Sequence, residues 1–244
     1  MRLTRVHVDV PLAPGMELAL PEAPAVHLAR VLRLGVGDGC VLFNGDGSDY
    51  AAHVLAIGKR ELRVSVTAAT PVDRESPLRI VLLQGIARGE KMDLILQKAA
   101  ELGVSAIYPV TSQRSEVKLD EARAAKRLTH WRSVVIAACE QSGRAVVPEV
   151  TAPATLQDAL VSLPTGGLRL LLDPESAQSL ATLPSIDGQV LLAVGPEGGW
   201  SPRDREQLQS AGFQGLRLGP RVLRTETAGL AAIAALQSRL GDLA

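Results

Sequence analysis

The sequence has few aromatic residues and few cysteines, and its charges do not favour either sign. Phe, Trp and Tyr make up 2% of the chain, so the 46% of hydrophobic residues must build an aliphatic interior. Cys40 and Cys139 form no Cys-x-x-Cys pair, so neither a disulfide framework nor a zinc site is indicated. The 26 basic residues balance 26 acidic ones, and no net field attracts a nucleic acid. The composition predicts a globular protein.

Targeting segments and several common enzyme motifs are also missing. Residues 1–5 lack the apolar core of a signal peptide, and no apolar run has the length of a bilayer span. We therefore expect a cytoplasmic protein with no membrane partner. No G-x-G-x-x-G turn occurs near Gly85, and the chain contains no phosphate loop, H-E-x-x-H or G-x-S-x-G motif. The four histidines are scattered, which argues against a metal centre.

The first 70 or so residues predict a small β-rich domain. Apolar and polar residues alternate around residues 6–10 and 62–66, as in half-buried strands. Two further strands are expected at 40–43 and 50–57, joined by the hairpin signal Asn44-Gly45-Asp46-Gly47. Leu28, Val31 and Leu32 form the apolar stripe of one helix. We predict a barrel over residues 1–72, and the proline-bracketed polar segment 70–77 is the best domain boundary.

The remaining residues, 73–244, predict a single α/β domain. Continuous apolar runs at 80–83 and 190–194 indicate buried strands, and two further strands are expected at 104–110 and 168–172. The first two runs enclose a helix with Met92, Ile95, Leu96 and Ala99 on one face and Gly103 as its stop. A second, longer helix is expected over 121–141. Strand, helix and strand at this spacing predict a parallel sheet covered on both faces.

Two glycine-bearing loops come late in this domain. The run 190–194 stops at Gly195-Pro196-Glu197-Gly198-Gly199, and Ser201-Pro202-Arg203-Asp204 then predicts a capped helix start. A short strand at 216–218 is followed by Gly219-Pro220 and a loop that runs to Thr225, a plausible cap for the last helix. Ligands bind at this edge of open α/β sheets, although such loops are also ordinary turn chemistry.

These two loops resemble the cofactor-binding signature of the trefoil-knotted (SPOUT) RNA methyltransferases. More narrowly, they resemble the family that methylates N3 of a uridine in small-subunit ribosomal RNA. The similarity extends to four further segments: Arg30-Val31-Leu32-Arg33-Leu34, Arg88-Gly89-Glu90-Lys91-Met92, Gln97-Lys98 through Glu101-Leu102-Gly103-Val104, and Ala137-Ala138-Cys139-Glu140-Gln141. It therefore covers nearly the whole chain.

The resemblance implies a knotted C-terminal methyltransferase domain, a PUA-like N-terminal barrel that binds RNA, and a homodimer. It further implies S-adenosylmethionine as cofactor and the uridine usually numbered 1498 of 16S ribosomal RNA, within the small subunit, as substrate. The implied cofactor-binding residues are Leu172, Asp173, Gly195, Pro196, Glu197, Gly198, Gly199, Leu218, Gly219, Leu223, Arg224, Thr225, Glu226, Thr227 and Ala228.

Arg224 and Glu197 are the candidate catalytic residues. Arg224 could hold a phosphate or a uracil oxygen as charge develops, and a carboxylate could accept the N3 proton. The alternative roles are structural: Glu226 caps the last helix, and Glu197 orders its own loop. The candidate RNA-binding residues, which could instead form ordinary solvated helix faces, are His27, Arg30, Arg33, Arg88, Lys91, Arg114, Lys118, Arg132 and Arg144.

Two alternatives to this function remain open. The motifs report the cofactor better than the substrate, so the chain could methylate another RNA, such as transfer RNA. It could also be a non-catalytic RNA-binding assembly factor that keeps the fold. Intact cofactor loops favour the enzyme over this last alternative.

Overall fold

The computed structural model describes residues 4–58, 61–115, 120–184 and 188–243 of the chain. Two compact units divide it: Met1–Glu75 with Cys139–Val147, and Ser76–Ala138 with Pro148–Ala244. The residues 139–147, which lie far along the chain, thus group with the N-terminal unit. The domain boundary predicted from the sequence, between residues 72 and 73, placed residues 139–147 in the second domain.

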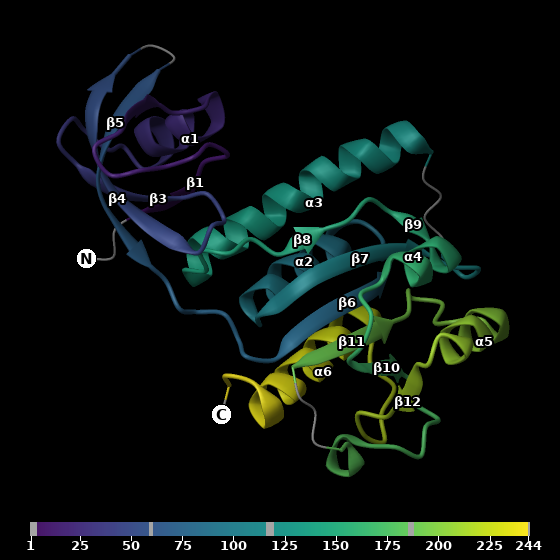
Figure 1. Cartoon of the computed structure of the whole chain (residues 1–244). Helices are drawn as coiled ribbons and strands as arrows, with labels where there is room; N and C mark the ends of the chain where they lie inside the picture. Colours follow the sequence, from purple (N-terminus) through teal and green to yellow (C-terminus); the bar gives the residue numbers. More distant parts are fainter. Residues whose placement is uncertain (1–3, 59–60, 116–119, 185–187, 244) are drawn as a thin grey trace. The chain divides into compact units, whose positions relative to one another are not determined.

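A mainly antiparallel sheet forms the first unit (Figure 1). Among the described residues it has five strands in the order β1-β3-β4-β5-β2, with β1 and β3 parallel. Its elements are β1 (Arg5–His7), β2 (Glu17–Ala19), the short α1 (Glu22–Val26), the π-helix η1 (His27–Val31), β3 (Gly39–Phe43), β4 (Ser48–Ile57) and β5 (Leu62–Pro71). The predicted turn at 44–47 joins β3 to β4, where Gly45 and Gly47 take positive φ.

The predicted apolar stripe of the N-terminal helix is wrong in detail. Leu28 is fully buried in the core of the first unit, but Val31 and Leu32 are 64% and 40% exposed. Residues 27–31 form a π-helical turn, which holds more residues per turn than an α-helix. Residues three and four positions after Leu28 therefore leave its face.

The second unit is built on a parallel sheet. Its described part has seven strands in the order β12-β10-β11-β6-β7-β8, with β9 paired to β7. The strands are β6 (Arg79–Gly85), β7 (Val104–Thr111), β8 (Glu149–Val150), β9 (Ala154–Thr155), β10 (Leu168–Leu172), β11 (Gln189–Val194) and β12 (Gln214–Leu216). The helices are α2 (Glu90–Glu101), α3 (Glu121–Ser142), which contributes to both units, α4 (Leu156–Ser162), η2 (Leu180–Thr182), α5 (Pro202–Ser210) and α6 (Thr225–Leu240).

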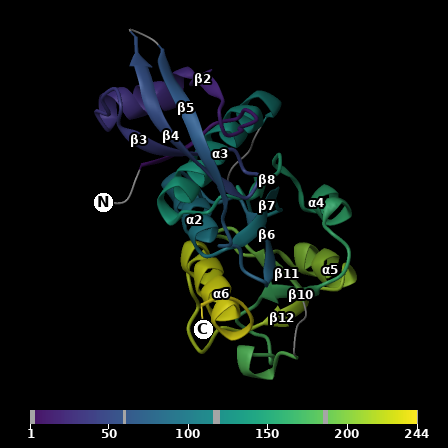
Figure 2. The ribbon, with the colours of Figure 1, turned by 60° about the vertical axis from the view of Figure 1, so that its left-hand side comes forward.

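Helices cover both faces of this sheet, as the continuous apolar strands require. Figure 2 shows α2 and α6 on one side and α4 and α5 on the other. The predicted helix face of α2 is confirmed, since Met92, Ile95, Leu96 and Ala99 are at most 1% exposed. The four predicted strands are confirmed as β6, β7, β10 and β11. No helix of the described residues has the length and apolarity needed to cross a membrane.

Two local predictions near the C-terminus need correction. The last strand lies at Gln214–Leu216 and not at 216–218, because Leu216 pairs with Leu172 and the chain then leaves the sheet. Thr225 is the first residue of α6 and not its cap, and the cap residue, Arg224, makes no side-chain cap hydrogen bond. The predicted cap of α5 is confirmed, since Ser201 and Asp204 form a reciprocal capping box.

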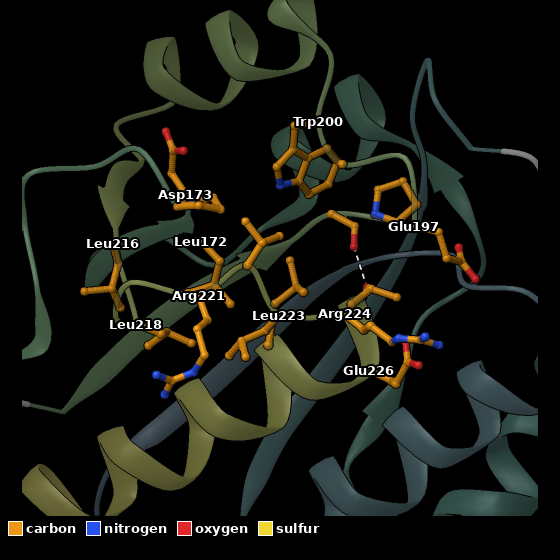
Figure 3. A pocket seen from close by; sticks show the side chains of 18 of the residues that line it. Leu172, Asp173, Glu197, Trp200, Leu216, Leu218, Arg221, Leu223, Arg224 and Glu226 are labelled. Atoms are coloured by element: carbon orange, nitrogen blue, oxygen red, sulfur yellow. Dashed lines mark hydrogen bonds between the residues drawn. The ribbon is translucent and has the colours of Figure 1, made fainter.

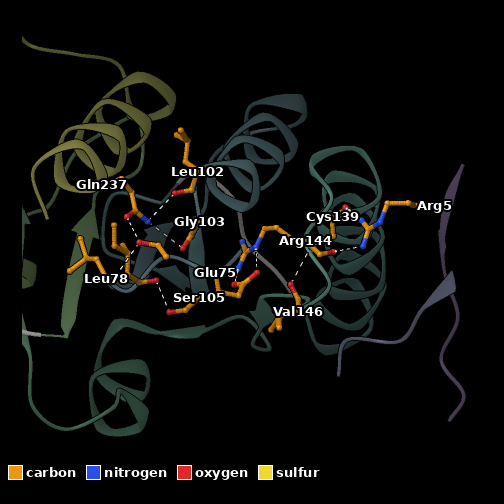
Figure 4. A network of polar contacts seen from close by, with 12 residues as sticks. Arg5, Glu75, Leu78, Leu102, Gly103, Ser105, Cys139, Arg144, Val146 and Gln237 are labelled. Atoms are coloured by element: carbon orange, nitrogen blue, oxygen red, sulfur yellow. Dashed lines mark hydrogen bonds and ion pairs between the residues drawn. The ribbon is translucent and has the colours of Figure 1, made fainter. Parts of the chain in front are cut away.

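The buried amide of Gln237 anchors the C-terminal helix to the body of the second unit. Its Nε2 donates to the carbonyl oxygen of Leu102 at 3.1 Å, and its Oε1 accepts from the hydroxyl of Ser76 at 2.6 Å (Figure 4). Gln237 is fully buried, so these bonds satisfy a group that would otherwise destabilise the fold. The end of α6 is thereby fixed to the turn between α2 and β7.

Candidate functional site

Three neighbouring parallel strands end at the same edge of the sheet, and a cavity of about 370 Å³ opens there. Asp173 follows β10, residues 195–199 follow β11, and residues 217–224 connect β12 to α6. The structure thus brings together segments that are about 50 residues apart in sequence. Predicted cofactor residues that line the cavity are Leu172, Asp173, Gly195, Pro196, Glu197, Gly199, Leu218, Gly219, Leu223, Arg224, Thr225, Glu226 and Ala228.

The loop of residues 195–199 packs directly on the end of β6. A Cβ atom on Gly85 would lie 2.4 Å from the backbone nitrogen of Pro196, so no other residue fits there without moving the loop. Within the loop, the N–H of Gly199 donates to the carbonyl oxygen of Pro196 at 2.8 Å, and Gly199 has φ of +65°. The close approach and the left-handed residue both require glycine.

A buried polar contact joins this loop to the start of α6. The hydroxyl of Thr225 donates to the carbonyl oxygen of Gly195 at 2.5 Å, and it accepts from Nε2 of Gln84 at 3.2 Å. Gln84 is fully buried at the end of β6, where its Nε2 also donates to the carbonyl oxygen of Gly85. The side chain of Thr225 therefore connects the start of α6 to the 195–199 loop and to the end of β6.

The interior of the cavity is mainly aliphatic. Leucines from three segments, together with a valine from β11, provide the apolar wall, and Trp200 closes one side (Figure 3). A flat apolar slot with exposed backbone groups at its glycines suits a heterocyclic base, whose edge can pair with peptide N–H and C=O groups. The apolar lining residues of this wall are Leu172, Val194, Leu216, Leu218 and Leu223.

Two carboxylates and an ammonium group lie together at one end of the cavity. Nζ of Lys91 is 3.6 Å from Oε1 of Glu197 and 3.8 Å from Oε2 of Glu226. Oε1 of Glu197 also accepts from the backbone N–H of Arg88 at 3.0 Å. Burial would raise the pKa of Glu197, but the Arg88 N–H and the nearby ammonium outweigh it and hold this pKa below its ordinary value. Glu197 is therefore ionised at neutral pH.

The opposite end of the cavity contains a second ion pair. NH1 of Arg205 lies 2.6 Å from Oδ2 of Asp173, and Oδ1 of Asp173 accepts from the backbone N–H of Glu175 at 3.0 Å. The side chain of Asp173 is 16% exposed. Arg205 is on α5, four residues after its cap Ser201, so the helix start places the guanidinium at the strand edge.

Sequence reasoning missed several residues of the cavity wall, and it assigned Lys91 to RNA. The lining residues that were not predicted for the cofactor are Lys91, Pro174, Val194, Trp200, Arg205, Leu216, Arg221 and Val222. Trp200 could have been found, because it directly follows the 195–199 loop. Arg205 gave no comparable signal, since only the three-dimensional start of α5 brings it to the site.

Two predicted cofactor residues lie outside the cavity lining, Gly198 and Thr227. The carbonyl oxygen of Gly198 points away to accept from NH1 of Arg114 at 3.2 Å. Thr227 is exposed on the first turn of α6. Neither residue lines the cavity in the structure.

The predicted RNA-binding residues fall into separate groups. Arg88, Lys91 and Arg114 surround the 195–199 loop through the contacts described above. In the first unit, Arg30 and Arg33 are exposed and His27 is partly buried. Arg132 is exposed on α3 and donates to the carbonyl oxygen of Val150. Lys118 lies outside the described residues.

Arg144 does not suit the predicted RNA contact. The residue is 4% exposed, its Nε donates to Oε1 of Glu75 at 2.9 Å, and NH2 contacts the other oxygen (Figure 4). In the same unit, Arg5 donates to the carbonyl oxygens of Arg144 and Cys139. The guanidinium of Arg144 is buried and contacts both carboxylate oxygens of Glu75, so Arg144 has a structural role in the first unit.

Comparison with known proteins gives consistent matches over the whole chain. The model of a family described as "RNA methyltransferase domain" matches residues 74–237, and one described as "RNA methyltransferase PUA domain" matches residues 25–67. A ribosomal RNA small subunit methyltransferase E from Buchnera aphidicola is 31% identical over 99% of this chain and 98% of its own.

Solved structures agree with these matches. A ribosomal RNA small subunit methyltransferase E from Neisseria gonorrhoeae, bound to S-adenosyl methionine, is 41% identical with a TM-score of 0.95, and each chain is covered completely. A methyltransferase from Legionella pneumophila, in complex with the bound cofactor SAM, is 38% identical with the same TM-score and covers 99% of this chain and 100% of its own.

Proposed function

The chain belongs to the family of RNA methyltransferases whose domain matches residues 74–237, and we propose that it methylates N3 of a uridine in 16S ribosomal RNA. The observation that carries this proposal is the end-to-end similarity to small-subunit ribosomal RNA methyltransferases, one of them with S-adenosylmethionine bound. The uridine is the one usually numbered 1498. The assembled small subunit is the substrate, and the enzyme works in the cytoplasm as a homodimer.

The cavity at the strand edge is the proposed seat of S-adenosylmethionine. Its adenine fits between the aliphatic side chains of Leu218 and Leu223, with glycine backbone groups at its edge. The charged end of the cavity, with Glu197, Lys91 and Glu226, then lies nearest to the sulfonium and the methyl group. The carboxylates of Glu197 and Glu226 at this end can complement the positive charge of the sulfonium.

Arg224 is the proposed catalytic residue. Methyl transfer from a sulfonium is an in-line displacement, so alignment and the loss of the N3 proton are its main demands. As N3 loses its proton, negative charge spreads onto the uracil oxygens, and the guanidinium of Arg224, which is exposed at the cavity wall, can stabilise it. Glu197 is a weaker candidate for the proton acceptor than the sequence suggested, because its pKa is lowered. We assign it to holding the 195–199 loop against residues 88–91.

Transfer assays separate this substrate from the alternatives. Small subunits are isolated from a strain that lacks the gene for this protein, so that the uridine is unmethylated. The purified protein should methylate them, and mass mapping should place one new methyl group on the uridine. Arg224→Ala should reduce this transfer by at least about a hundredfold and leave the fold unchanged, because the guanidinium acts on the transition state. Transfer to transfer RNA in place of the subunit would refute the substrate. Binding of RNA without measurable affinity for S-adenosylmethionine would refute the enzyme.

A further inference from the structure

Trp200 lines the cavity, and its indole N–H is a buried donor without an acceptor among the described residues. Trp200 is 4% exposed and packs in the same core cluster as Leu208 and Phe213. Its Nε1 is inaccessible to solvent, and no acceptor among the described residues lies within hydrogen-bond distance. Buried indole groups usually have a partner, and an unpaired buried donor destabilises a fold. A hydrogen-bond acceptor on a bound ligand would satisfy this N–H.

The backbone on both sides of Trp200 is held in place, which limits where its ring can point. The next residue, Ser201, is buried and caps α5: its N–H donates to Oδ2 of Asp204 at 2.9 Å, and its hydroxyl accepts from the N–H of Asp204 at 3.1 Å. The 195–199 loop fixes the chain on the other side. Core side chains also pack around the ring and limit its rotation.

An acceptor carboxylate belongs to the same end of the cavity. In Figure 3 the nitrogen-bearing edge of Trp200 is turned towards the side of the cavity where Leu172 and Asp173 lie. Each oxygen of Asp173 already accepts one hydrogen bond, from Arg205 or from Glu175, and a carboxylate oxygen can accept a second. The cavity therefore offers one unused donor and a carboxylate with remaining acceptor capacity.

We propose that Trp200 and Asp173 together bind a ribose hydroxyl of S-adenosylmethionine. The indole N–H donates a hydrogen bond to the hydroxyl oxygen, and the hydroxyl donates a hydrogen bond to the carboxylate of Asp173. A hydroxyl is both donor and acceptor, so it satisfies both groups at once. The carboxylate of S-adenosylmethionine does not fit this position, because the carboxylate of Asp173 would repel it. The adenine does not need Trp200 or Asp173, because the aliphatic wall and the glycines provide its contacts. This assignment rests on the cavity being the seat of the donor, as proposed above.

Calorimetric titration of the full chain with S-adenosylmethionine tests this assignment. Trp200→Phe keeps an aromatic ring and removes the N–H, so its dissociation constant should rise about tenfold, which corresponds to about 1.4 kcal/mol. Trp131→Phe is the matched control, because Trp131 is equally buried, at 1% exposure, but does not line the cavity. This control should leave the affinity unchanged. Equal affinities in the two variants would overturn the proposal.

Cofactor analogues test the hydroxyl independently of how well Trp200→Phe folds. S-adenosylhomocysteine and its 2′-deoxy and 3′-deoxy forms are titrated into each protein. In the wild type, one deoxy form should bind about tenfold more weakly than the parent compound, whereas in Trp200→Phe this ratio should fall towards one. A wild type that binds both deoxy forms as well as the parent, or an unchanged ratio in the variant, would overturn the proposal. Each ratio is measured within one protein, so a general loss of affinity cancels.

A cavity-filling variant separates failure of this proposal from failure of the proposed seat. Leu218→Trp places a large ring in the aliphatic wall and should abolish binding. If it does, and Trp200→Phe binds normally, the seat stands and the hydroxyl assignment fails. If Leu218→Trp is folded and binds with wild-type affinity, the seat itself is wrong, and the assignment falls with it.

Discussion

The contact of Thr225 with Gly195 and Gln84 predicts that one hydroxyl holds the cavity's walls together. Thr225→Val preserves the side-chain shape but removes a donor to the Gly195 carbonyl and an acceptor for Gln84 Nε2. The Gln84 amide keeps its bond to Gly85, whereas the Gly195 carbonyl loses a partner. With about 1 kcal/mol for the lost bond to Gln84 and about 1–3 kcal/mol for the Gly195 carbonyl left buried and unpaired, we expect a total destabilisation of about 2–4 kcal/mol.

Thermal unfolding and calorimetry measure this effect. For a domain of this size, each kcal/mol lowers Tm by about 2–4 °C, so Tm should fall by about 4–16 °C. Affinity for S-adenosylmethionine should fall about tenfold or more, because each 1.4 kcal/mol spent on repositioning the loop changes the dissociation constant tenfold. Thr225→Ser retains the hydroxyl and should recover most of the affinity.

Thr227→Val is the matched control for this change. Thr227 is exposed on the same turn of α6 and does not line the cavity, so its replacement should change stability by less than about 0.5 kcal/mol. If Thr225→Val matches Thr227→Val in both Tm and affinity, the hydroxyl does not hold the loop, and the account of the cavity's construction is refuted.

Three further predictions concern the loop, the thiols and the effect of pH. Gly85→Ala puts a Cβ 2.4 Å from the backbone nitrogen of Pro196, so it should destabilise the fold by about 1–3 kcal/mol or more and eliminate S-adenosylmethionine binding in calorimetry. Burial raises the pKa of Cys40 and of Cys139 to about 11, so neither thiol should react with a disulfide reagent at about pH 8 until urea unfolds the chain; fast labelling of the native protein would contradict this. The lowered pKa of Glu197 means that its stabilising contribution is complete above the ordinary value of 4.5 and is lost as pH falls through the lower folded value. Urea unfolding should therefore show a weaker pH dependence for Glu197→Gln than for the wild type in that acidic range.

The sequence predicted those parts of the fold that depend on local pattern. Mainly apolar segments identified β6, β7, β10 and β11, because strands covered on both faces are rich in apolar residues. The cap of α5 was equally clear, since Ser201 and Asp204 satisfy each other within one turn. The π-helical turn after Leu28 could not be predicted, because the pattern assumed 3.6 residues per turn.

For the site, sequence reasoning found the glycine-bearing loops but not their neighbours. Gly195 and Gly219 carry a signal because glycine permits unusual backbone geometry, whereas Arg205 reaches the cavity only because the start of α5 lies at this strand edge. Arg144 shows the opposite limit: a basic residue in a basic segment is buried against Glu75, and no pattern distinguishes it from an exposed one. The threading of the C-terminal segment through an earlier loop, which the family resemblance implies, stays a prediction.

The walls of the cavity are drawn from segments spread between Lys91 and Ala228. A nascent chain emerging from its own site of synthesis cannot assemble this pocket until α6 has been made, since Thr225 and Glu226 belong to that helix. The methyl donor therefore cannot act as a template for the early stages of folding. Occupancy by the methyl donor therefore requires that α6 has already been made.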